Sequence, residues 1–228
     1  MTQIVLHLAG KPVHCSFMRY LVHALGAFAL LGPAACSAAD TALFNGHDFA
    51  GWEFISPTPT GIDRVCQILP DGVIAASGKP TGFIATTASH ENYRLHAEWR
   101  WPDKPGNSGV LLHISSGPRD RAWPLSLQVQ MKNKSAGDLL PMAGATFAEP
   151  LAADQKTPVR LHTNPDSEKP AGEWNSCDIV CRGNTIEVTV NGVLRNSVSQ
   201  AFPAGGRIGF QFEGTPFEIR QVTLSPLE

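Results

Sequence analysis

The last third of the chain alternates between apolar and polar side chains. Over residues 185–190 the aliphatic side chains fall on one face of an extended chain and the polar ones on the other. A period of two is typical of a β-strand with one buried face. Asn191-Gly192 follows at once, and both residues tolerate the positive φ that a type I′ turn requires. The pattern predicts a β-hairpin whose return strand covers residues 193–198.

Short segments with similar patterns recur along the chain, and Gly, Pro, Asn or Asp lies between most of them. The predicted strands are residues 66–69, 73–76, 83–86, 93–101, 109–114, 125–131, 176–181, 185–190, 193–198, 207–212 and 217–225. No long helical period or internal repeat is visible. Many short strands separated by turn residues predict an all-β single domain, a β-sandwich or jelly roll.

The N-terminal part of the sequence has the pattern of a signal peptide. An apolar run over residues 21–31 follows Met18-Arg19, and small residues follow over 34–39. This order is typical of a secretory signal, and the run is shorter than the ~20 apolar residues of a transmembrane helix. The alternative is a buried N-terminal helix. We expect export to the periplasm or the extracellular space.

The mature protein is expected to begin after Ala39. Residues 1–39 then form a leader and signal peptide, with the true start expected at Met18, and residues 40–228 form the domain. Cys36 offers an alternative, because a lipoprotein cysteine at this place would anchor the exported chain to a membrane lipid.

Charge and cysteine content narrow the function classes. The formal charge is −2 at pH 7 and no Lys/Arg run is present, which argues against nucleic acid or an anionic membrane as partner. Cys177 and Cys181 share one strand face but lie ~13 Å apart at ~3.3 Å per residue, too far to form a disulfide. Cys66 either bonds to one of them, or all three are buried thiols. No Cys or His spacing suggests zinc.

Polar residues gather on one face of several predicted strands. If these strands share a sheet, its outer face carries Glu98, Arg100, His113, Gln128, Gln130, Gln211 and Glu213. Amides, carboxylates and guanidinium groups on a concave face suit sugar hydroxyls, which both donate and accept hydrogen bonds. The alternative is an ordinary solvated face, because the outer faces of antiparallel sheets are polar in any case. Two longer loops, residues 102–108 and 139–170, either carry function or are solvated insertions.

An ordered set of short motifs resembles the 3-keto-disaccharide hydrolase domain family across nearly the whole mature chain. The motifs are Leu43-Phe44-Asn45-Gly46, Gly51-Trp52, Asn107-Ser108-Gly109-Val110-Leu111-Leu112-His113, Pro124-Leu125-Ser126-Leu127-Gln128-Val129-Gln130, Gly137-Asp138, Gly172-Glu173-Trp174-Asn175, Asn191-Gly192 and Gly209-Phe210-Gln211-Phe212-Glu213-Gly214. The resemblance implies a concanavalin A-like jelly roll, usually exported and bacterial. It also implies hydrolysis or elimination of 3-keto-glycosides on the concave face.

The implied chemistry needs a base for the C2 proton, an electrophile for the enolate oxygen and an acid for the leaving group. With the resemblance, the candidate catalytic residues are Glu98, His113 and Glu213. The candidate substrate-binding residues are Arg100, Gln128, Gln130, Gln211 and Trp174. A divalent cation, held by carboxylate and histidine, is a further way to stabilise the enolate.

One residue departs from the family pattern. The family usually has Glu where this chain has Gln128, and a Gln amide cannot accept a proton as a general base. Two functions therefore stay open. The first is an exported enzyme that cleaves 3-keto-glycosides, and the second is a non-catalytic, lectin-like carbohydrate-binding module.

Export has a direct test. Because the apolar run and the small residues that follow it form a signal, protein purified from its native host should begin near Asp40. N-terminal sequencing together with the intact mass checks this. Recovery of a soluble chain that still begins at Met1 would contradict it.

Overall fold

The computed structural model describes residues 39–227, which form one domain. Almost all of the predicted signal peptide lies outside the described residues, so export, cleavage and the Cys36 anchor stay predictions. In residues 39–227 no helix is long and apolar enough to cross a membrane. The only helical element described there is a single 3₁₀ turn, Ile62–Arg64.

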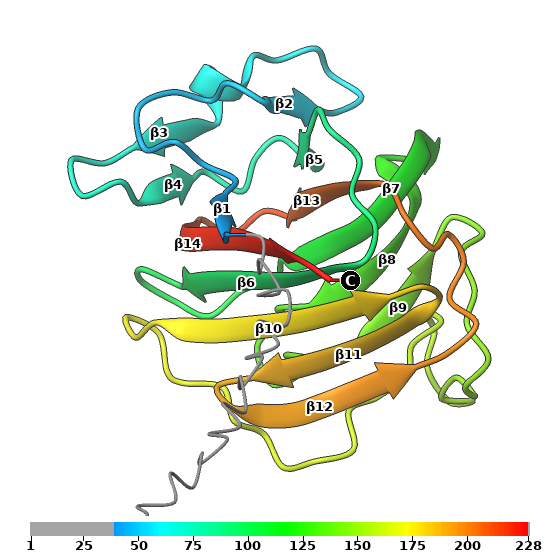
Figure 1. Ribbon diagram of the computed structural model, residues 1–228. Coiled ribbons are helices and arrows are strands. Elements are labelled where there is room, and N and C mark those ends of the chain that lie inside the picture. Colours follow the sequence, from blue (N-terminus) through cyan, green and yellow to red (C-terminus); the bar gives the residue numbers. More distant parts are fainter. Residues whose placement is uncertain (1–38, 228) are drawn as a thin grey trace, which may run out of the picture. The chain divides into compact units, whose positions relative to one another are not determined.

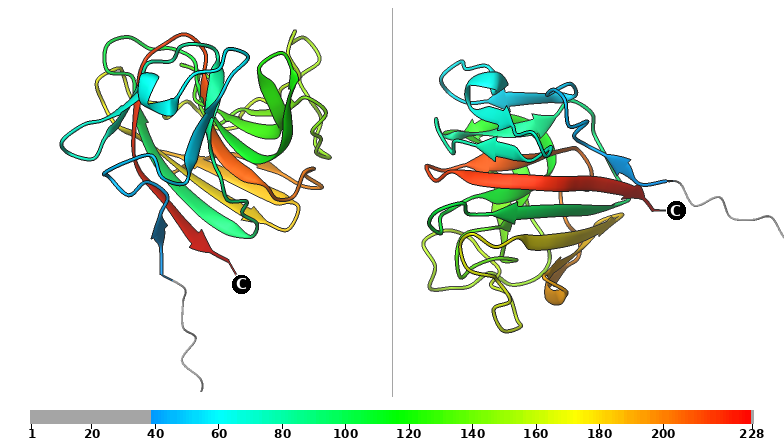
Figure 2. Two further views of the ribbon diagram at one scale, coloured as in Figure 1. Left: turned by 90° about the horizontal axis from the view of Figure 1, so that it is seen from above. Right: turned by 90° about the vertical axis from the view of Figure 1, so that its left-hand side faces the viewer.

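Two antiparallel sheets build the domain (Figure 1). The eight-stranded sheet has the order β12-β11-β10-β6-β14-β4-β3, and β1 pairs with β14 at its side, as Figure 2 also shows. Its strands are β1 (Thr41–Ala42), β3 (Cys66–Ile68), β4 (Ile74–Ala76), β6 (Tyr93–Arg100), β10 (Asn175–Arg182), β11 (Thr185–Val190), β12 (Val193–Val198) and β14 (Phe217–Pro226).

The six-stranded sheet has the order β2-β5-β13-β7-β8-β9. Its strands are β2 (Trp52–Ile55), β5 (Gly82–Thr86), β7 (Gly109–Asp120), β8 (Trp123–Gln130), β9 (Leu139–Met142) and β13 (Arg207–Phe212). β7 and β8 are long, and they curve as they leave the sheet (Figure 2).

The core lies between the two sheets, because each strand turns one alternating set of apolar side chains inward. The buried cluster takes Tyr93, Leu95, Ala97 and Trp99 from β6. From β13 it takes Ile208, Phe210 and Phe212. The prediction of a two-sheet β-sandwich from alternation is therefore confirmed.

The Asn191-Gly192 turn has the predicted geometry. Asn191 has φ 50° and Gly192 has φ 79°, and the flanking strands β11 and β12 pair antiparallel as expected. Every predicted strand is present, and most end within two residues of the expected bounds. Three strands were not predicted, namely β1, β2 and β9, and β7 continues six residues further than the pattern indicated.

The three cysteines of the domain are buried free thiols. Burial raises the pKa of Cys66 to about 12 and that of Cys181 to about 12, so neither thiol is ionised near neutral pH. Of the two arrangements left open by the sequence, the one with three buried thiols is found.

Candidate functional site

A groove of ≈ 730 Å³ crosses the outer face of the six-stranded sheet. Its floor contains Gln128 and Gln130 of β8 and Gln211 of β13. One wall comes from the tip of the β7–β8 hairpin at Asp120–Trp123, and the other from residues 140–144 and 154–161. The long loop after residue 139 thus helps to form the groove, as the sequence allowed.

The floor is a network of neutral amides. The Nε2 group of Gln128 donates to Oε1 of Gln130 at 3.1 Å and to Oε1 of Gln211 at 3.2 Å. The backbone N–H of Lys132 donates to the same oxygen of Gln130 at 3.2 Å. Gln128 is only 1% exposed, and its own Oε1 is buried without a partner among the described residues. That unpaired acceptor is suited to a ligand hydroxyl.

Gly109 makes room for this network. It lies opposite Gln130 in the β7–β8 ladder. A Cβ atom on Gly109 would come within 2.6 Å of Nε2 of Gln128, so any larger residue would displace the central amide.

Glu213 stands at the edge of the floor, directly after β13. Asn107 Nδ2 donates to its Oε2 at 2.7 Å. Desolvation in the groove raises the pKa of Glu213, and the positive charges of Lys132 and Arg121 oppose that rise. Glu213 is exposed, so it combines access to a ligand with a pKa moved towards neutrality. It is the one predicted catalytic residue that lies in the groove.

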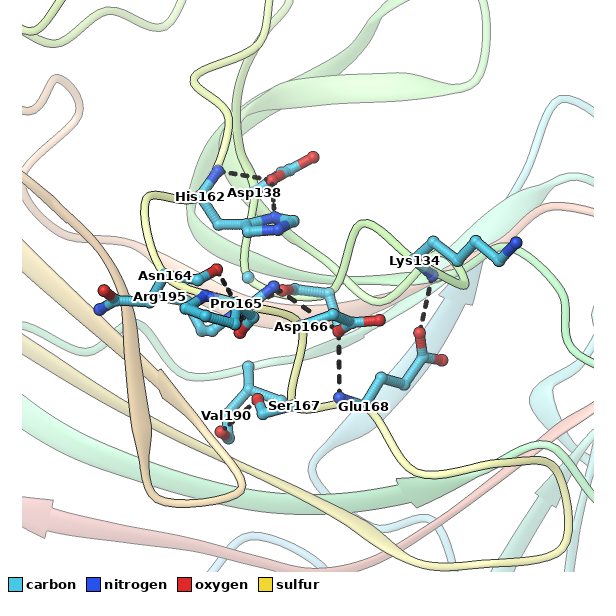
Figure 3. Close-up of polar contacts among 12 residues, drawn as sticks. Lys134, Asp138, His162, Asn164, Pro165, Asp166, Ser167, Glu168, Val190 and Arg195 are labelled. Atoms are coloured by element: carbon cyan, nitrogen blue, oxygen red, sulfur yellow. Dashed lines mark hydrogen bonds and ion pairs between the residues drawn. The ribbon is translucent and has the colours of Figure 1, made fainter.

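Asp138 is a second carboxylate of the groove, and it is 3% exposed. Its backbone carbonyl accepts from the N–H of Gln130 at 2.8 Å, which places it beside the amide floor. Oδ1 accepts from the backbone N–H of His162 at 2.7 Å and lies 2.6 Å from Nδ1 of the same residue (Figure 3). The sequence contained its signal in the Gly137-Asp138 motif, but no pattern pointed to His162.

Arg195 holds the backbone around this Asp–His pair. It is 0% exposed, and a register shift in the β11–β12 ladder turns both Arg195 and Asn196 inward. The guanidinium donates to the carbonyl of Ala136 at 3.1 Å, to that of Asn164 at 2.8 Å and to that of Pro165 (Figure 3). One buried side chain thus joins the turn before Asp138 to the loop after His162.

Two predicted catalytic residues lie elsewhere, and the assumption of one shared sheet was wrong. Glu98 belongs to β6, which is in the eight-stranded sheet, and its Oε2 pairs with Nε of Arg220 at 2.5 Å. Arg100 is on the same strand and pairs with Glu218 at 2.5 Å. Trp174 stacks against both arginines, with the Arg220 guanidinium 4.1 Å from the ring centroid. Glu98, Arg100 and Trp174 therefore belong to a cluster of two ion pairs and one stacked ring that lies outside the groove.

His113 was also misplaced, because the β7 strand is irregular at this residue. His113 has φ 56°, and the β7–β8 register shifts between Leu112 and Ser116. The irregularity turns His113 inward, where it is 0% exposed and lies edge-on to Tyr93 at 5.8 Å between ring centroids. Burial lowers the pKa of His113, so the ring is neutral near pH 7.

A metal ion has no evident set of ligands in the described part of the chain. Nowhere within residues 39–227 do three or more His, Cys, Asp or Glu side chains gather closely enough to hold one. The divalent cation that the resemblance allowed therefore has no assigned position.

The sequence of residues 39–225 matches the 3-keto-alpha-glucoside-1,2-lyase-like domain family. The chain belongs to this family. No curated protein matches the sequence.

Solved structures support the same fold. A proposed glycosyl hydrolase from Parabacteroides distasonis ATCC 8503 is 25% identical, with a TM-score of 0.62 over 83% of this chain and 94% of that one. The carbohydrate-binding module CBM66 from Bacillus subtilis is 12% identical, with a TM-score of 0.54 over 77% and 95%. LamAcat from Zobellia galactanivorans is 13% identical, with a TM-score of 0.53 over 83% and 97%. These likenesses show that the domain has a jelly-roll fold.

The Arg195 anchor gives a testable consequence for stability. Arg195→Lys keeps the charge but loses the planar fork that reaches three carbonyls, so we expect the free energy of unfolding to fall by ~2–4 kcal/mol. Urea denaturation measures this. Arg94→Lys, at an exposed position of β6, is the matched control and should change stability by less than ~0.5 kcal/mol. Equal effects of the two substitutions would contradict the anchoring role.

Proposed function

We propose that the domain cleaves 3-keto-glycosides in the groove by removing the C2 proton and expelling the group on C1. The observation that carries this proposal is the pair of carboxylates, Glu213 and Asp138, that border one amide floor. The floor offers both donors and acceptors for sugar hydroxyls. Membership of the lyase-like family supports the same chemistry. A related fold, LamA from Z. galactanivorans, has been solved with laminaritriose and laminaritetraose.

Glu213 is the proton acceptor in this mechanism. The ketone at C3 acidifies the C2–H bond, and the carboxylate of Glu213 takes that proton while the electron pair moves to the C3 oxygen. A general base works best when its pKa lies near the working pH, and desolvation moves the pKa of Glu213 in that direction. The ammonium group of Lys132, which also lines the groove, supplies positive charge for the enolate oxygen.

Collapse of the enolate then breaks the C1–O bond and leaves a double bond between C1 and C2. The oxygen that leaves takes a proton from solvent water. For net hydrolysis, water adds to C1 and Glu213 returns a proton to C2. Because Glu213 is exposed, the proton that it took exchanges with solvent before this return. Asp138 takes the proton of the attacking water, and His162 holds the carboxylate of Asp138 in place for this step. Gln128 has no proton-transfer role here, since its amide is part of the floor. Export of the domain remains part of the proposal.

Replacing Glu213 tests the assignment. Glu213→Gln removes the base but keeps the shape and a hydrogen-bonding group, so turnover of a chromogenic 3-keto-glucoside should fall by ~10²–10⁴-fold, with KM changed by less than ~3-fold. Glu187→Gln, at an exposed position of β11, is the matched control and should keep full activity. Unchanged turnover in Glu213→Gln would exclude Glu213 as the base, and Asp138→Asn would then be the next substitution.

The pH dependence of kcat/KM should report the ionisation of Glu213. The base acts when ionised, so kcat/KM should fall as the pH drops through a pKa above the ordinary range for glutamate. Lys132 lowers that pKa, so Lys132→Gln should move the acid limb of the profile to higher pH. An acid limb that stays in place in both Lys132→Gln and Glu213→Gln would assign the titration to another group.

One observation favours the second function, a carbohydrate-binding module without catalysis. The position where the family usually has Glu holds Gln128, which is buried and committed to amide hydrogen bonds. Calorimetric binding of a 3-keto-glucoside with no turnover of it in wild type would establish this alternative.

A further inference from the structure

A second hollow, of ≈ 700 Å³, opens beside β5, β13 and β7. Its lining includes Ile55, Phe83 and Ile114, together with Ser89, Ser116 and Arg207. None of these residues has a part in the mechanism proposed above. The hollow and the groove both use β13, because Arg207 lines the former and Gln211 lines the latter.

Strand register shows that the two hollows share one face of the sheet. Gln211 of the groove floor pairs directly with Phe83 of β5. Residues paired across an antiparallel ladder point to the same side, with Cβ atoms ~5 Å apart. Phe83 is therefore the immediate neighbour of the groove floor. Arg207 and Gln211 are separated by about 13 Å at ~3.3 Å per residue, which is the reach of a sugar ring with one or two further rings attached.

The chemistry changes sharply along this face. The groove presents Gln, Asn, Asp and Glu side chains, whereas the hollow lies over a separate apolar cluster of Phe83, Ala85, Leu111 and Ile114, with Ile55 packed against it. The other side chains of the hollow are Ser89, Ser115, Ser116, His90, Glu91 and Arg207. Arg207 already donates to Oε1 of Glu53 and to the carbonyl of Thr86, so the hollow offers a ligand no amide and a single carboxylate, Glu91. A second sugar ring needs several such groups for its hydroxyls, whereas a flat apolar group needs few.

Two residues at the hollow have unpaired polar atoms. Oγ of Ser116 and Nε2 of His90 are buried, and neither has a hydrogen-bond partner among the described residues. Burial also lowers the pKa of His90, so its ring is neutral near pH 7 and can accept or donate a single hydrogen bond. Unpaired buried groups of this kind suit a ligand with one or two hydroxyls on an apolar frame.

We propose that the hollow binds the aglycone of the substrate, and that this aglycone is an aromatic, phenolic group rather than a second sugar. The inference rests on the proposed function of the groove and names the substrate class of the combined site. The 3-keto sugar lies over the amide floor, and the aryl group lies in the hollow against Ile55 and Ile114.

The reaction suits this class of leaving group. When C1=C2 forms, the C1–O bond breaks and the aryl oxygen leaves as a phenolate, which then takes a proton from water. A phenol has a pKa of ~10, so its anion departs without a general acid. Such an acid is not needed in the hollow, where the histidine is neutral.

Binding of three probes tests the proposal. The probes are methyl, glucosyl and 2-naphthyl 3-keto-glucosides, titrated by ligand-observed NMR into Glu213→Gln so that turnover does not interfere. The naphthyl compound should bind at least ~10-fold more tightly than either of the others, because it alone buries a large apolar surface. Equal affinities, or tightest binding of the glucosyl compound, would overturn the proposal.

Substitutions at the hollow test whether the preference for the naphthyl compound arises there. Ser115 is exposed on β7 and lines the hollow, so Ser115→Trp added to Glu213→Gln should fill it and bring naphthyl binding to within ~3-fold of methyl binding. Ser89→Trp, from the other wall, should do the same if the first variant folds poorly. Ser197→Trp, at an exposed strand position of the other sheet, should keep the preference. A naphthyl preference that survives both hollow substitutions would overturn the proposal.

The two proposals fail in different ways. If wild type turns over the methyl compound but shows no naphthyl preference, the groove mechanism stands and the aglycone site does not. If naphthyl binding depends on the hollow and no compound is turned over, the aglycone site stands and the lyase mechanism fails.

Discussion

The packing of the two sheets constrains everything else in this domain. Each strand has two faces, and the inner ones are committed to a dry core that includes Trp99, Phe210 and Phe212. Polar chemistry is therefore confined to the outer faces. On the eight-stranded sheet, that face around β6 is occupied by ion pairs such as Glu98–Arg220. The outer face of the six-stranded sheet holds the amide floor and the two carboxylates. The same strands therefore carry core residues on one face and groove residues on the other.

Two departures from strand regularity shape the site. The irregularity at His113 sends that side chain into the core and leaves Ile114 in the apolar cluster beside the groove. The register shift near Arg195 brings a guanidinium inside, where it anchors the segments that carry Asp138 and His162. Each irregularity interrupts the regular pairing of two strands. Each also moves one side chain to the face opposite the one that simple alternation predicts.

Alternation along the sequence predicted the faces of single strands well, and with them the sandwich and the amides at Gln128, Gln130 and Gln211. It could not predict which strands share a sheet, because pairing between distant segments leaves no period in the sequence. Glu98 was grouped with Glu213 for that reason. His113 was placed on the wrong face because a bulge interrupts the alternation at this residue. β9 was missed because it is a four-residue strand at the start of a loop with five prolines, where the sequence gives little pattern. Asp138 comes just before this loop in the Gly137-Asp138 motif, which carried no indication of its role.

The central claim is that the C2–H bond breaks in the groove, and isotope incorporation at C2 tests it most directly. Wild type should act on a 3-keto-glucoside in D₂O, with the released 3-keto-glucose examined by NMR at early times. Product incubated without substrate serves as the control for spontaneous exchange. The account predicts one deuterium at C2 in excess of that control, formed at the rate of cleavage. Cleavage that leaves the C2 hydrogen in place, with no primary kinetic isotope effect for substrate deuterated at C2, would mean direct hydrolysis at C1 and would contradict the account.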